Sequence, residues 1–92
     1  MFDEFMTDKI IIKKENGDLI KDLKASVQES KIFLNHSDVV IEDHDLIQQV
    51  LSNGTTKVFK VLDAGFQESF SAIDAHYQMK VKKLDLKTEI WQ

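Results

Sequence analysis

Two Asn-Gly pairs, Asn16-Gly17 and Asn53-Gly54, lie between short apolar runs and limit the possible folds more than any other feature. An Asn-Gly pair in this setting favours a type I′ turn, which needs positive φ at both residues and joins neighbouring antiparallel strands. The chain has 92 residues, only three Gly and no Pro, so most of its length can enter strand ladders. We therefore expect an antiparallel meander that curls into a small barrel or sandwich.

The apolar pattern predicts an all-β fold of six to seven short strands. Alternation is clearest between Leu23 and Gln28 and again between His76 and Lys83, where Tyr77, Met79 and Val81 share one face. Strands are expected at residues 10–12, 19–28, 31–34, 39–41, 46–51, 57–62 and 76–83. One short helix or helical turn is expected near residues 66–72, where apolar side chains recur at spacings of four and three.

We expect a single domain, with a small β-barrel at residues 9–83, an N-terminal arm at 1–8 and a C-terminal tail at 84–92. The chain has no Cys, which excludes disulfides and thiolate metal sites. It also lacks an apolar run of about 20 residues and a secretory signal at its start. We therefore expect no membrane partner, and a location in the cytoplasm, or in the virion if the protein is phage-derived.

The sequence offers no clear chemistry. His36, His44 and His76 lack the spacing of a zinc site. The Asp43-His44-Asp45 turn is acidic enough to suggest a hard cation, but it lacks the fixed offsets of a calcium loop. The favoured interpretation is a solvated turn in which both Asp side chains bond the backbone and His44 tolerates positive φ. We expect no catalytic, cofactor-binding or metal-binding residue, no small-molecule substrate and no enzymatic activity.

The charge pattern weakens the case for nucleic-acid binding without removing it. All 12 basic residues are Lys, and 16 acidic residues give a net charge of −4. Arg is the usual reader of guanine and phosphate because of its planar fork. Lys80, Lys82, Lys83 and Lys87 form the one candidate basic face. Nucleic acid is thus an unlikely partner, and a nucleic-acid-binding barrel is the alternative function.

Five aromatic residues fall outside the clean strands: Phe2, Phe5, Phe66, Phe70 and Trp91. They could plug the two mouths of a barrel, or they could anchor an interface, because aromatics are enriched in interface cores. The sequence does not decide between these two roles. The second role implies other protein subunits as partners, with a homo-oligomer among the possible arrangements.

Five segments carry a resemblance to known proteins: residues 24–28 (Lys-Ala-Ser-Val-Gln), 41–45 (Ile-Glu-Asp-His-Asp), 51–54 (Leu-Ser-Asn-Gly), 61–66 (Val-Leu-Asp-Ala-Gly-Phe) and 76–81 (His-Tyr-Gln-Met-Lys-Val). Over residues 9–83 the chain resembles a family of small, uncharacterised bacterial and prophage-encoded β-domains. More weakly, it is similar to the small β-barrel head–tail joining proteins of tailed phages. That resemblance implies a non-enzymatic structural or interaction module, in which arms and loops contact neighbouring subunits, and it assigns no site residue.

Overall fold

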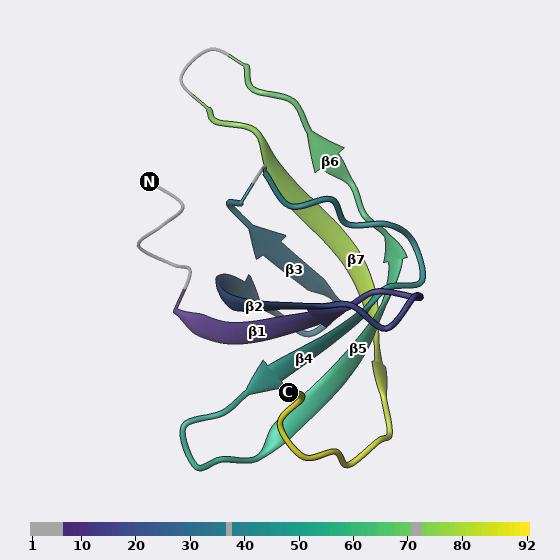
Figure 1. The fold of residues 1–92 in the computed structure, drawn as a ribbon. Helices are drawn as coiled ribbons and strands as arrows, with labels where there is room; N and C mark the ends of the chain where they lie inside the picture. The colour runs from purple at the N-terminus through teal and green to yellow at the C-terminus, as the bar shows by residue number, and fades with distance from the viewer. Residues whose placement is uncertain (1–6, 37, 71–72) are drawn as a thin grey trace.

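The computed structural model describes residues 7–36, 38–70 and 73–92, and these residues form antiparallel strands joined by turns and loops (Figure 1). Seven strands are formed: β1 (Asp8–Lys13), β2 (Leu19–Val27), β3 (Lys31–Leu34), β4 (Leu46–Val50), β5 (Thr56–Asp63), β6 (Phe66–Gln67) and β7 (His76–Leu84). Six of them close into a barrel in the order β3-β2-β1-β4-β5-β7, because β7 also pairs with β3. The predicted all-β barrel is confirmed.

The barrel consists of two three-stranded meanders that meet along two seams. The first meander contains β1, β2 and β3, and the second contains β4, β5 and β7. The seams are the antiparallel pairs β1–β4 and β3–β7. Barrel closure leaves these six strands without a free edge, which removes a common route to aggregation.

Both Asn-Gly turns have a different geometry from the predicted type I′ turn. Gly17 and Gly54 have φ of 94° and 85°, but neither Asn16 nor Asn53 has positive φ. The amide of each Gly donates to the carbonyl three residues before it, at 2.9 Å in the first turn and 3.0 Å in the second. Each loop is therefore a three-residue connection that ends on a left-handed Gly. The Asn side chains accept bonds from the amides of Asp18 and Thr55 instead.

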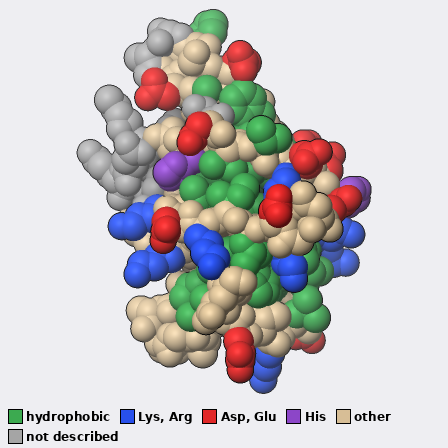
Figure 2. All heavy atoms as spheres, viewed as in Figure 1, with side chains coloured by type: hydrophobic (Ala, Val, Ile, Leu, Met, Phe, Trp, Pro, Cys, Tyr) green, Lys and Arg blue, Asp and Glu red, His purple; other side chains and the backbone are tan. Residues whose placement is uncertain are grey.

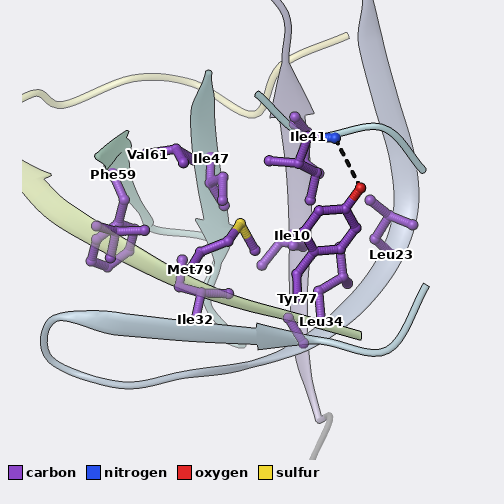
Figure 3. Close-up of a cluster of buried hydrophobic side chains, with 13 residues drawn as sticks. Ile10, Leu23, Ile32, Leu34, Ile41, Ile47, Phe59, Val61, Tyr77 and Met79 are labelled. Atoms are coloured by element: carbon purple, nitrogen blue, oxygen red, sulfur yellow. Dashed lines mark hydrogen bonds between the residues drawn. The ribbon is translucent and has the colours of Figure 1, made fainter. Parts of the chain in front are cut away.

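The barrel interior is filled by hydrophobic side chains, most of them aliphatic, together with Met79 and the aromatic Phe59 and Tyr77 (Figure 3). Residues from every strand of the barrel contribute, since alternate side chains of each strand point inward. The cluster consists of Ile10, Ile12, Leu23, Ala25, Ile32, Leu34, Ile41, Ile47, Phe59, Val61, Tyr77, Met79 and Val81. The predicted inward face of the last strand is confirmed.

The expected strand at residues 39–41 is not formed. Those residues belong to the connection between β3 and β4, which must cross from one meander to the other. The hydroxyl of Tyr77 donates to the carbonyl of Val39 at 2.5 Å. It also accepts from the amide of Ile41 at 3.3 Å (Figure 3). A core side chain thus satisfies backbone groups that would otherwise pair in a sheet, and Ile41 enters the core.

Replacing Tyr77 with Phe should cost about 1–3 kcal/mol of unfolding free energy, because it leaves the buried Ile41 amide without its acceptor. Urea denaturation measures the change. Thr55→Val is a matched control: it removes an exposed hydroxyl bonded to Asn53 and should cost well under 1 kcal/mol. Equal losses in the two variants would show that the Tyr77 hydroxyl does not hold the crossing connection.

The C-terminal tail packs against the outer face of the barrel. Gln48 points outward from β4 yet is fully buried, because the tail covers it. Its amide nitrogen donates to Thr88 Oγ1 at 2.7 Å and to the Glu89 carbonyl at 2.8 Å, and its oxygen accepts from the Trp91 amide at 2.9 Å. Ile11 and Val58 are also buried outside the barrel interior. These contacts make the tail part of the fold.

The expected helix near residues 66–72 is corrected: no helix occurs among residues 7–36, 38–70 and 73–92. The apolar spacing there arises from a hairpin, in which Phe66–Gln67 pairs with the start of β7. No helix in the described part of the chain is long and apolar enough to cross a membrane.

Candidate interaction surfaces

The hairpin formed by β6 and the start of β7 extends beyond the barrel (Figure 1). Phe66 lies opposite Tyr77, and Phe70 lies opposite Ile73 with two backbone hydrogen bonds of 2.9 Å. Both pairs belong to one continuous antiparallel register and lie four residues apart on each strand. Because side chains alternate along a strand, all four lie on the same side of the hairpin. That side is a continuation of the barrel's apolar inner face past the last point where β3 pairs with β7.

The apolar residues of this hairpin are exposed. Phe66 is 40% exposed, Ile73 50% and Phe70 79%. The Phe66 ring contacts Tyr77, with centroids 4.8 Å apart at 59°, but the other two residues lie beyond the core. Figure 2 shows hydrophobic side chains at the top of the view, where the hairpin ends. A projecting element with apolar side chains on one side is typical of a binding surface.

Gly65 allows the base of the hairpin to pack closely against β7. It has φ of 59°, and its carbonyl accepts from the Gln78 amide at 3.1 Å. A Cβ at this position would lie 2.3 Å from the Gln78 carbonyl oxygen. The Asp63 carboxylate accepts from the Gly65 amide, and the Asp43 carboxylate accepts from the Ala64 amide, each at 3.0 Å. The base of the hairpin is therefore closely fitted to β7.

The other predicted interface aromatics have different positions. Trp91 is half-buried in the tail, where Lys13 Nζ lies 5.5 Å from its ring centroid. Phe2 and Phe5 lie outside the described residues, as does most of the predicted N-terminal arm. Of the five aromatics that the sequence singled out, the structure brings Phe66 and Phe70 together.

The outer face of β3, β7 and β5 carries four lysines. Lys31 lies opposite Lys80, and Lys60 lies opposite Lys82. Like charges directly opposite each other destabilise a sheet, and none of the four forms an ion pair with a described residue. Lys83 and Lys87 do not join this group: Lys83 alternates to the other side of β7, and Lys87 lies in the tail. Lys31 and Lys60 were not predicted, because strand pairing across the barrel is not visible in the sequence.

The acidic turn at residues 42–45 forms an ion pair with Lys14 in place of a cation site. The Asp45 side chain is 1% exposed; it contacts Lys14 Nζ and accepts from the Glu42 amide at 2.8 Å. Lys14 also lies 3.1 Å from the Glu42 carboxylate and donates to the Val40 carbonyl at 3.0 Å. No group of three or more side chains within residues 7–36, 38–70 and 73–92 is arranged to hold a metal ion.

Two details of this turn were predicted correctly, but its solvated character was not, because Asp45 is buried and paired with Lys14. His44 has φ of 76°, and the carboxylates of Asp43 and Asp45 accept backbone amides. The other two histidines lie elsewhere. His36 is half-buried in the β3–β4 connection. His76 is buried, donates from Nδ1 to the Asp74 carbonyl at 2.8 Å and accepts at Nε2 from the side-chain Nε2 of Gln78 at 2.8 Å.

The ion pair predicts that the free energy of unfolding falls at alkaline pH. Burial lowers the pKa of Lys14, but the hydrogen bonds to Asp45 and Glu42 outweigh it, so the pKa is raised above its ordinary value of 10.5. Because the folded-state pKa is the higher one, this contribution is full below about pH 10.5 and is lost as the pH rises through the folded-state value. Thermal unfolding from pH 8 to 12 should show this loss, and Lys14→Met should flatten it. An equal alkaline loss in the variant would contradict the assignment.

Comparisons of the chain with protein-family models, with curated proteins and with solved structures found no significant match. The class of the protein is therefore defined by its own fold, a closed six-stranded antiparallel β-barrel with one projecting hairpin.

Proposed function

We propose that this protein is a non-enzymatic protein-interaction module that binds other subunits through the β6–β7 hairpin. The single observation that carries the proposal is the apolar side of the hairpin, where Phe70 is 79% exposed. Aromatic residues that project from a rigid element serve as interface anchors at low entropic cost. The barrel that supports the hairpin is closed and packed with hydrophobic side chains.

A connector-type subunit of a phage or prophage fits this proposal. The resemblance to small head–tail joining barrels supports it, since those proteins contact their neighbours through projecting segments. The place of action would then be the host cytoplasm during assembly and the virion afterwards. Capsid and tail genes next to the gene of this protein would support the assignment, and a neighbourhood of unrelated host genes would count against it.

A photo-crosslinking amino acid at position 70 tests the interaction directly. In its native cells, we expect ultraviolet light to join this chain to another protein subunit, either a second copy or a different protein. The control position is Lys57, which is exposed near the start of β5, far from the hairpin along that strand. The proposal fails if position 70 gives no more adduct than position 57 and light scattering finds a monomer at all concentrations.

The lysine pairs favour one second candidate, the binding of a nucleic-acid backbone. Lys31, Lys60, Lys80 and Lys82 present four positive charges on one face, none of them in an ion pair with a described residue, although Asp63 also lies opposite Lys80. Contacts with about four phosphates of a single strand would give a salt slope of about −3 in a plot of log K against log salt. Fluorescence anisotropy with single-stranded DNA measures this slope. The absence of binding at low salt, or equal binding by a Lys80→Glu/Lys82→Glu variant, would exclude the candidate.

A further inference from the structure

A groove of about 390 Å³ lies between strands β1 and β2 and the C-terminal tail. Its apolar lining includes Ile11, Val50, Ile90 and Trp91. Asp22 lies at its border with φ of 61°, where a bulge shifts the register between β1 and β2. A bulge bends its strand, and Asp is among the non-Gly residues that tolerate this left-handed conformation.

The groove carries an unbalanced positive charge. Lys9 lies opposite Lys24 across the β1–β2 pair, and Lys21 also lines the groove. Asp22 is the one acidic residue of the lining, and none of these lysines forms an ion pair with a described residue. Two lysines directly opposite each other repel, so an anionic partner would relieve that repulsion. The groove therefore fits an apolar segment that also carries acidic side chains.

The β6–β7 hairpin is a segment of that kind. Residues 66–79 contain the acidic Glu68 and Asp74 and no Lys or Arg. Glu68 and Asp74 flank the exposed Phe70 and Ile73. The hairpin thus complements the groove in two ways: its apolar side chains match the apolar lining, and its negative charge neutralises the lysines.

We propose that the hairpin of one copy of this protein docks in the β1–β2 groove of a second copy. Figure 1 shows the hairpin extending away from the C-terminal tail, which forms one wall of the groove, so Phe70 and Ile73 meet this groove on another molecule and not on their own. Hairpin and groove are different surfaces, so the contact is head-to-tail and builds a ring or an open chain. This inference rests on the proposed function and names a second copy as the partner.

A disulfide test between two variants measures the docking, because the natural chain has no Cys. One variant carries Ser69→Cys in the hairpin, and the other carries Lys21→Cys in the groove. Docking would hold the two thiols close, so we expect the mixture to form the mixed disulfide at least about tenfold faster than either variant pairs with itself. The control partner is Ser30→Cys, an exposed position outside the groove lining. Equal rates with the groove and control partners would overturn the proposal.

Light scattering with charge reversal gives a second, independent measurement. We expect concentration-dependent assembly of the natural chain, loss of assembly with Phe70→Ser or Lys24→Glu, and recovery when Lys24→Glu is combined with Glu68→Lys. If Phe70→Ser abolishes assembly while Lys24→Glu has no effect, the hairpin uses another surface and this inference is wrong. If the protein stays monomeric while position 70 crosslinks to a different protein, the proposed function stands and self-docking is excluded.

Discussion

Replacing Asp45 with Ala should destabilise the protein by about 3 kcal/mol, because it removes a buried carboxylate that pairs with the part-buried Lys14 and accepts the Glu42 amide. The Asp45 side chain is 1% exposed and holds both the Glu42 amide and the Lys14 ammonium group. The same residue also joins the turn to β5, since its carbonyl accepts from the Val61 amide at 2.8 Å. For a domain of this size the loss is a large part of its total stability. Urea denaturation at pH 7 measures it.

Two further variants separate the ion pair from its surroundings. Asp43→Asn changes an exposed carboxylate in the same turn that accepts one amide bond, and it should cost less than about 1 kcal/mol. The double variant Asp45→Ala/Lys14→Met should be more stable than Asp45→Ala alone, because it removes a part-buried cation that has lost its buried partner and keeps only the exposed Glu42 carboxylate. A loss below 1 kcal/mol for Asp45→Ala would show that the pair contributes little.

Replacing Gly65 with Ala should cost about 3 kcal/mol or more and should loosen the projecting hairpin. A left-handed conformation costs a non-Gly residue about 1–2 kcal/mol, and overpacking adds about 1–3 kcal/mol. The added Cβ would lie 2.3 Å from the Gln78 carbonyl oxygen, so the pairing of the hairpin must shift. Hydrogen exchange should show reduced protection of the Gln78 amide, which bonds the Gly65 carbonyl.

Gly17→Ala is the matched control for Gly65→Ala. Gly17 also has positive φ, at 94°, but nothing lies within 4 Å of its added Cβ. Gly17→Ala should therefore lower the free energy of unfolding only by the cost of the left-handed conformation, about 1–2 kcal/mol. Equal losses at the two positions would contradict the steric argument, and the hairpin would not depend on close contact at its base.

The hairpin connects stability to the proposed function. Gly65 and the Phe66–Tyr77 contact fix the base of the hairpin on the barrel. Phe70 and Ile73 lie beyond the part of the hairpin that pairs with β3, and they project from it. A pre-organised element loses little entropy on binding. Phe70→Ser removes an exposed side chain, so it should impair assembly while leaving the unfolding free energy almost unchanged.

Local patterns in the sequence were sufficient to predict the fold class and most strands. Alternation in the last strand correctly placed Tyr77 and Met79 in the core, since the side-chain period of a strand is a local property. The Asn-Gly pairs correctly marked two hairpins, but their turn type was wrong. The polar side chains of Asn16 and Asn53 bond backbone amides in the observed loops, and residue identity alone did not distinguish the two geometries.

Tertiary structure alone decided how these elements are used. The sequence could not show that Tyr77 would hold residues 39–41 out of a strand, or that the tail would cover Gln48, because both contacts join residues more than 35 positions apart. Pairing between strands far apart in the sequence likewise set Lys31 beside Lys80. The sequence by itself determined a small antiparallel β-barrel. Long-range register determined which aromatics project and which lysines gather, because strand order and register depend on the closure of the whole barrel.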